Sequence, residues 1–75
     1  MELNDFTEKF AGCFNITDPS LITADTEFRK LDEWGSMLAL IVIAMVDSDY
    51  GKTITAEEMR SVNTPRELFA LLNNK

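Results

Sequence analysis

Histidine is absent from the 75-residue chain, and cysteine occurs once, at Cys13. Without histidine, no Ser-His or Cys-His pair can activate a nucleophile, which argues against a small serine hydrolase. With a single cysteine, neither an internal disulfide nor a cysteine metal cluster can form. We interpret Cys13 as a small buried hydrophobe and expect no metal site.

Basic residues are also scarce, since seven Lys and Arg face thirteen Asp and Glu and the net charge is -6. Negative charge opposes the phosphate neutralisation that supplies most nucleic-acid affinity, so we expect no nucleic-acid partner. An acidic protein is steered instead toward basic patches on other proteins. We expect a monomer that meets such partners.

Long apolar runs are missing as well. The longest, Met37 to Val46, has ten residues, whereas a membrane-spanning helix needs about twenty. The chain opens "MELNDFTEKF", with acids where a secretory signal has its basic end. The sequence therefore predicts a cytoplasmic protein without a membrane span, and its length predicts one domain over residues 1–75.

Apolar spacing predicts a first helix that ends near Asn15. The residues on its apolar face are Leu3, Phe6, Phe10 and Phe14. From Ile16 to Gly35 the chain is polar and interrupted by Asp18-Pro19, which predicts a long loop. We expect four apolar residues to anchor this loop to the core: Leu21, Ile22, Phe28 and Leu31.

Capping signals predict three further helices. Ser36 is the expected N-cap of a helix that runs to about Tyr50 and ends at Gly51. "TAEE" has the form of a capping box, which predicts a short helix from Thr55 to Val62 with Met59 in the core. In "TPREL", Thr64 is the expected cap of a fourth helix, and Glu67 is expected to reach back to it.

Leu68, Leu71 and Leu72 should be buried by the fourth helix. No alternating period predicts a strand, so the expected fold is all-α: a small four-helix bundle with a long loop between helices one and two and a short third helix.

The second helix is apolar on more than one side. At 100 degrees per residue, the best candidate core face consists of Ala39, Val42, Ile43, Val46 and Tyr50. Met37, Leu40, Ile41, Ala44 and Met45 point largely the other way. One helix of a small bundle cannot readily bury both sides, so we expect an exposed apolar patch that binds partners.

The stretch after this helix partly matches a calcium loop, with Asp47, Asp49 and Glu58 at positions one, three and twelve. Gly51 and Lys52 then occupy the positions that need an oxygen ligand and a glycine. A helix end followed by a capping box explains the same residues better.

From Phe28 onward the sequence resembles the acyl carrier protein family, in which a loop leads into an Asp-Ser-Leu motif at the start of the second of four helices. Here the motif is Gly35-Ser36-Met37 within "LDEWGSM". The resemblance continues through "VDSDYG", "TITAEEM" and "TPRELFALL" and covers well over half of the chain. It implies the four-helix fold of these carriers.

The resemblance also implies that Ser36 is not a catalyst but the attachment point for 4'-phosphopantetheine, transferred from coenzyme A by a separate transferase. The arm would carry acyl intermediates as thioesters between enzymes of fatty acid, polyketide or related biosynthesis. The implied partners are the phosphopantetheinyl transferase and acyl-transferring or ketosynthase-type enzymes with basic patches. A hydroxyl at a helix N-terminus suits a phosphodiester, because free N-H groups and the positive end of the dipole lie beside it.

Two departures from the family pattern stand out. Gly35 replaces the aspartate before the serine, and helix two lacks the usual acids on its exposed side. The predicted partner-binding residues are therefore an apolar set with a charged rim: Met37, Leu40, Ile41, Ala44, Asp47, Asp32 and Glu33. Taken without a pocket or a partner, Asp32 and Glu33 are solvated charges rather than an acid/base pair.

Two alternatives remain open. Within the carrier class, the chain could be an aminoacyl carrier of the peptidyl or D-alanyl type. In another class, it could be an unmodified helical adaptor that retains the carrier fold, with Gly35 as the trace of a lost modification site.

Overall fold

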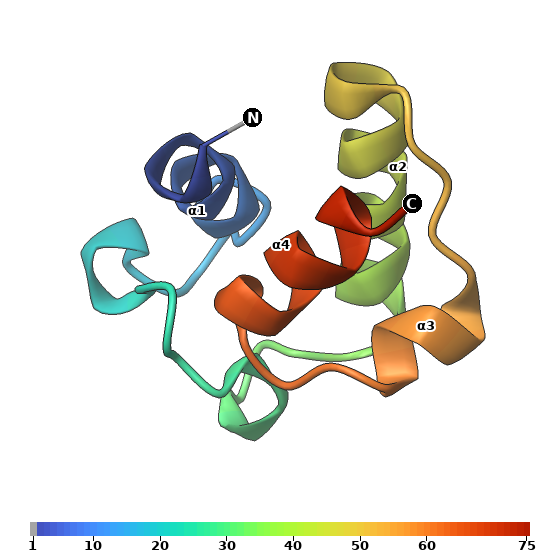
Figure 1. The fold of residues 1–75 in the computed structure, drawn as a ribbon. Helices are drawn as coiled ribbons and strands as arrows, with labels where there is room; N and C mark the ends of the chain where they lie inside the picture. Colours follow the sequence, from blue (N-terminus) through green and yellow to red (C-terminus); the bar gives the residue numbers. More distant parts are fainter. Residues whose placement is uncertain (1) are drawn as a thin grey trace.

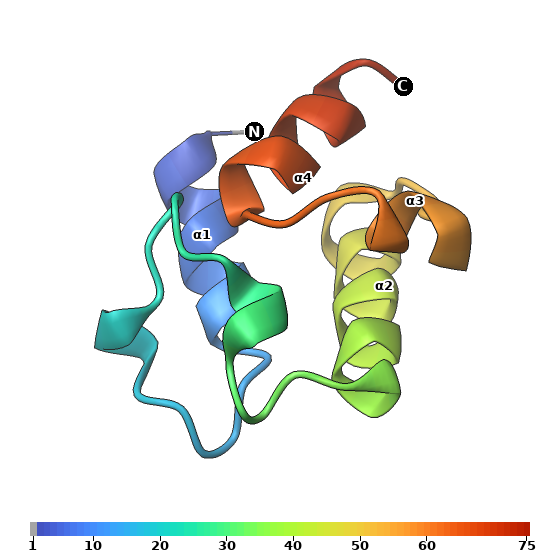
Figure 2. The ribbon, with the colours of Figure 1, turned by 90° about the horizontal axis from the view of Figure 1, so that it is seen from below.

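The computed structural model describes residues 2–75, and in this range it contains four α-helices, two single-turn 3-10 helices and no strand (Figure 1). In chain order the elements are α1 (Leu3–Ala11), η1 (Pro19–Leu21), η2 (Phe28–Lys30), α2 (Ser36–Tyr50), α3 (Ala56–Arg60) and α4 (Pro65–Asn73). Figure 2 shows α1 running down the page and α2 running up it, whereas Figure 1 shows α1 nearly end-on and α2 along its length, so the two helices are inclined to each other rather than antiparallel. Helix α4 packs mainly against α1. The predicted all-α fold with a long first connection and a short third helix is confirmed. Within residues 2–75, no helix has both the length and the apolar character needed to cross a membrane.

Helix α1 ends earlier than the sequence predicts. It stops at Ala11, and Gly12 follows as its C-cap. Phe6 and Phe10 are fully buried, and Phe14 is also buried although it lies beyond the helix end. The apolar spacing therefore identified the core residues correctly, because the turn after Ala11 keeps Phe14 on the same side of the chain.

The long connection between α1 and α2 is tied to the far end of the chain. The backbone N-H of Phe28 donates to the carbonyl of Asn63 at 3.0 Å, and that of Arg66 donates to the carbonyl of Ala24 at 2.9 Å. Arg66 also pairs with the Asp25 carboxylate at 2.8 Å. These contacts hold the connection against the segment that joins α3 to α4 and against the first turn of α4.

Two of the four predicted loop anchors are buried. Phe28 and Ile22 lie in the core, and Leu31 packs against it while partly exposed. Leu21 is wrong as an anchor, because 66% of its surface is exposed. It belongs to η1, whose single turn has no buried residue.

The helix ends follow the local capping signals. Gly51 adopts a left-handed conformation with φ of 66° directly after α2. Thr55 forms the complete capping box with Glu58 at the start of α3. Thr64 caps α4 by accepting from the Glu67 N-H, but the Glu67 carboxylate accepts from the N-H of Asn63 at 2.7 Å instead of that of Thr64.

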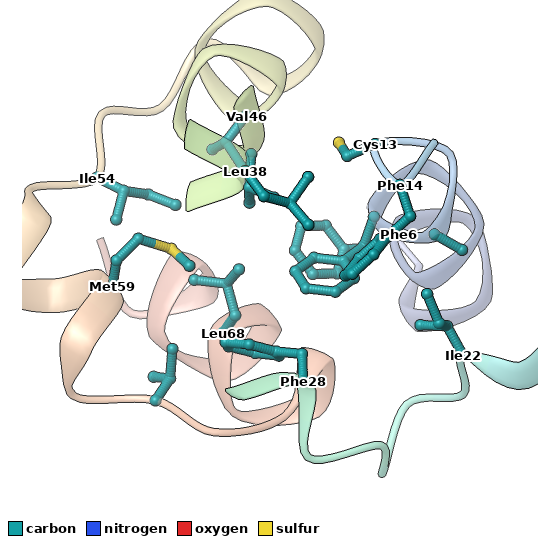
Figure 3. Packing of buried hydrophobic residues seen from close by; sticks show 14 of the residues in the cluster. Phe6, Cys13, Phe14, Ile22, Phe28, Leu38, Val46, Ile54, Met59 and Leu68 are labelled. Atoms are coloured by element: carbon teal, nitrogen blue, oxygen red, sulfur yellow. The ribbon is translucent and has the colours of Figure 1, made fainter. Parts of the chain in front are cut away.

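The core fills the space between the helices and the long connection (Figure 3). Its buried members are Phe6, Phe10, Ala11, Cys13, Phe14, Ile22, Phe28, Leu38, Val42, Val46, Ile54, Met59, Val62, Leu68 and Leu72. Helix α3 ends at Arg60, two residues earlier than predicted, yet both Met59 and Val62 are buried. In α4, Leu68 and Leu72 are fully buried and Leu71 is partly buried.

The core face of α2 differs from the prediction by a rotation of the helix. Its buried residues are Leu38, Val42 and Val46, which recur every four positions. Leu38 was missed, whereas the predicted Ala39, Ile43 and Tyr50 are only partly buried. Because residues 37–46 of α2 are apolar on all sides, their pattern carries little information about which side turns inward.

Candidate functional site

Ser36 is the first residue of α2 and is exposed to solvent. The prediction that it is the N-cap is wrong. Gly35 occupies that position, because its carbonyl accepts the first helical bond from the Ala39 N-H at 3.0 Å. Gly35 has no side chain to form a capping bond. The Ser36 hydroxyl therefore stands one residue inside the helix, with no hydrogen bond to any residue in the described part of the chain.

The first turn of α2 carries unsatisfied backbone donors. The N-H groups of Ser36, Met37 and Leu38 precede the first helical bond and have no intrahelical acceptor. The first turn contains no acidic residue. The positive end of the helix dipole is therefore not offset by a carboxylate at this end, which favours a bound anion over a bound cation.

A groove of about 330 Å³ adjoins Ser36 and lies mainly between α2 and α3. Its lining is Arg29, Trp34, Gly35, Ser36, Ala39, Leu40, Ile43, Ala56, Met59 and Arg60. The walls are apolar, and the charged side chains are the two arginines. An apolar group attached to Ser36 would therefore find adjacent apolar surface.

Arg29 fixes one side of this groove. Its Nε donates to the carbonyl of Val62 at 2.9 Å, and its Nη2 donates to the carbonyl of Met59. These carbonyls belong to the end of α3 and the residues after it, where helical acceptors are free. Arg29 thus holds α3 against the end of the long connection and places a positive charge at the groove.

Trp34 and Glu33 fix the segment directly before Ser36. The Trp34 ring packs 4.5 Å from the Phe28 ring, measured between centroids, and 6.3 Å from that of Phe10. The Glu33 carboxylate accepts from three consecutive backbone N-H groups, those of Asn15 at 2.6 Å, Ile16 at 3.1 Å and Thr17 at 2.8 Å. The two residues before Gly35 are therefore anchored to other parts of the chain. Glu33 binds residues 15–17, at the beginning of the long connection, and Trp34 packs against Phe28 and against Phe10 of α1.

The hydrogen bonds to Glu33 also change its ionisation. Desolvation acts to raise its pKa, but the N-H donors of Thr17, Asn15 and Ile16 outweigh it and lower the pKa to about 2. Glu33 is therefore not a free solvated charge, and its place on the partner-binding rim stays a prediction. Its carboxylate is committed to the backbone of residues 15–17, whereas Asp32 and Asp47 are exposed.

The predicted apolar patch is present on α2. Met37 is 76% exposed, Leu40 is 64% exposed and Ile41 is 39% exposed. Ala44 is exposed beside them, while Met45 is partly buried and packs against the core instead. The long connection does not cover this side of α2. We call the set Met37, Leu40, Ile41 and Ala44 the α2 stripe.

Arg29 and Arg60 line the groove although neither was predicted as a site residue. Arg60 lies in a short helix recognised only for its capping box, and Arg29 acts on carbonyls about thirty positions away in the chain. No local pattern marks either residue. Only the packing of α3 beside the start of α2 brings them to the same groove as Ser36.

The site offers an accessible hydroxyl without a base. The chain has no histidine, and the charged side chains that line the groove are arginines, which do not accept a proton at neutral pH. The groove lining therefore offers the Ser36 hydroxyl no proton acceptor of the kind that activates a serine nucleophile. Comparisons of the chain with protein-family models, with curated proteins and with solved structures found no match in any of the three.

Proposed function

We propose that the chain is a carrier protein whose Ser36 receives a 4'-phosphopantetheine arm and carries acyl groups on it as thioesters. The observation that carries this proposal is the position of the Ser36 hydroxyl. It is exposed on the first residue of a fifteen-residue helix, beside free N-H groups and a largely apolar groove.

The residues around Ser36 fit a phosphodiester. A new negative charge on Oγ would lie next to the free N-H groups of the first turn of α2 and would meet no carboxylate in that turn. The hydroxyl has no hydrogen bond to lose on modification. The terminal thiol of the arm supplies the thioester chemistry, so the protein needs no nucleophile of its own.

The modification itself is a phosphoryl-group transfer performed by a separate transferase. A bond forms between Ser36 Oγ and the phosphorus of the phosphopantetheine half of coenzyme A. The pyrophosphate bond of coenzyme A breaks, and adenosine 3',5'-bisphosphate leaves with the electron pair. The Ser36 hydroxyl proton passes to a base on the transferase, since the groove provides none.

The α2 stripe is the proposed docking surface for enzymes that load and use the arm. It begins beside Ser36, so a partner seated on it has the arm within reach. Asp32 and Asp47 would meet basic residues at the edges, while the centre of the contact would be apolar. The proposed partners are the transferase and acyl-transferring or ketosynthase-type enzymes of fatty acid, polyketide or related biosynthesis in the cytoplasm.

The α2 stripe also supports a second candidate, an unmodified helical adaptor that binds partners through this stripe alone. Exposed apolar patches mark protein contacts whether or not the protein is modified. The two candidates differ only in the use of the Ser36 hydroxyl, so modification at that atom decides between them.

The test is the intact mass of the protein after incubation with coenzyme A, magnesium and a broad-specificity phosphopantetheinyl transferase. We expect the wild type to gain one phosphopantetheine group and Ser36→Ala to gain none. Ser48→Ala is the matched control, because Ser48 is an exposed serine of the same helix, and it should be modified like the wild type. No gain with several transferases would reject the carrier and favour the adaptor.

A further inference from the structure

The groove beside Ser36 has the opposite charge to the protein as a whole. The net charge of the chain is -6, yet the groove is lined by two arginines and no carboxylate. A second cavity, of about 390 Å³, is lined by the carboxylates of Glu2, Asp5 and Glu8 together with Lys9 and Tyr50. Of these two cavities, the groove beside Ser36 is therefore the positively charged one.

Arg60 has no partner that would neutralise it among the described residues. Four of the other basic side chains form ion pairs with carboxylates, in the pairs Lys9–Asp49, Lys30–Glu27, Arg66–Asp25 and Lys75–Glu58. Arg29 is held by two carbonyls, which orient the guanidinium without cancelling its charge. Arg60 is exposed, lies directly after the buried Met59 and lines the groove. It is thus a cation available to an incoming anion.

We propose that Arg60, supported by the charge of Arg29, binds the phosphodiester of the arm on Ser36 and keeps the arm in the groove when no partner is bound. This inference rests on the proposed function, since it requires the arm. A phosphodiester keeps one negative charge at neutral pH, and guanidinium groups bind phosphate oxygens through charge-assisted hydrogen bonds. The remaining lining, from Leu40, Ile43 and Met59, offers apolar surface to the rest of the arm.

The electrostatic reason for such a device follows from the net charge. The net charge of -6 repels an anionic arm at long range, so without a cation at the groove the arm would favour open solvent. A cation at the groove reverses this preference locally. Because Arg60 is exposed, the attraction should weaken as the salt concentration rises.

The experiment compares backbone amide NMR spectra of the unmodified and modified protein, for the wild type, Arg60→Gln and Lys52→Gln. Lys52→Gln is the matched control, because it removes one positive charge from a residue that does not line the groove and forms no ion pair within residues 2–75. In the wild type and in Lys52→Gln, modification should shift the amide signals of Ala56 and Met59 on α3 as well as those next to Ser36.

In Arg60→Gln, the shifts on α3 should shrink while those next to Ser36 persist. We expect the ratio of docked to free arm to fall about threefold, the effect of losing one solvent-exposed ion pair. Added salt should reduce the α3 shifts of the wild type in the same way. Urea midpoints of the three unmodified proteins should agree, which separates docking from folding.

The outcomes distinguish this inference from the function on which it rests. If intact mass shows that no modified protein forms, the proposed function fails and the inference fails with it. If modified protein forms but only amides next to Ser36 shift, the arm does not dock and the inference alone is overturned. Equal α3 shifts in Arg60→Gln and Lys52→Gln would also overturn the role of Arg60.

Discussion

The orientation of α2 decides which residues form the core and which form the α2 stripe, and a matched pair of leucines tests it. Leu38 is 5% exposed and Leu40 is 64% exposed, although they lie two positions apart in the same helix. Truncation of either leucine to alanine removes three carbon atoms. Each such carbon group that is buried contributes about 0.8 kcal/mol to the free energy of unfolding. For Leu38 this predicts a loss of about 2–3 kcal/mol, the lower part of the range seen for buried leucines.

For Leu40 the same change should cost less than about 1 kcal/mol, because most of the side chain is already in water and no cavity forms. Helix propensity contributes little to the difference, since both variants exchange leucine for alanine. In a domain of this size, the two effects correspond to losses of about 10–20 °C and less than about 8 °C in Tm.

The assay is urea unfolding followed by the fluorescence of Trp34, the single tryptophan of the chain. Its ring packs against Phe28 and Phe10 in the native state, so unfolding changes its environment. Equal m-values in the two variants would show that the midpoints report stability. Equal losses for Leu38→Ala and Leu40→Ala, or a larger loss for Leu40→Ala, would refute the orientation of α2 and with it the α2 stripe.

Two further predictions concern the segment before Ser36. Glu33→Gln should destabilise the protein at neutral pH, because the pKa of Glu33 is lowered from 4.5 to about 2 in the folded protein. The ionised carboxylate therefore contributes its full stabilisation to the folded state above about pH 4.5, and this stabilisation is lost as the pH falls toward about 2. Urea midpoints across that interval should therefore fall less steeply for Glu33→Gln than for the wild type. Gly35→Asp should stabilise the protein by about 0.5 kcal/mol, because an N-cap carboxylate accepts from free N-H groups of α2 and a Cβ at this extended residue meets no atom within 4 Å. Gly51→Asp, at a φ of 66°, should instead destabilise it by about 1 kcal/mol in the same assay.

Local signals predicted the starts of α3 and α4 and the end of α2 well, because capping depends on residues within three or four positions. The ends of α1 and α3, which carry no such signal, come earlier than predicted. Thr55 and Thr64 both cap the helices that the sequence assigned to them, and Gly51 ends α2 in the expected conformation. The predicted N-cap of α2 was wrong by one position, since Gly35 and not Ser36 is the cap. A serine before an apolar run is compatible with either the N-cap or the first helical position, and the extended Gly35 takes the cap.

Features that depend on long-range packing were not predictable. The apolar run of α2 has no polar side to mark the solvent, so its rotation is set by the helices around it and Leu38 was missed. Glu33 reaches N-H groups sixteen to eighteen positions away. Arg29 reaches carbonyls thirty and thirty-three positions away. A charged residue looks the same in the sequence whether its partner is water or a distant backbone group.

These long-range contacts give the long connection a role in the proposed function. Glu33 binds the backbone at its beginning, Trp34 packs in the aromatic core, and Arg29 binds the end of α3. The same few residues therefore fix both the position of Ser36 and the wall of the groove beside it. Loosening the Glu33 contact should change the site as well as the stability, since the start of α2 is anchored through the residue two positions before Gly35. Acid below about pH 4.5 would weaken this contact progressively, because the Glu33 carboxylate loses its charge as the pH falls toward about 2.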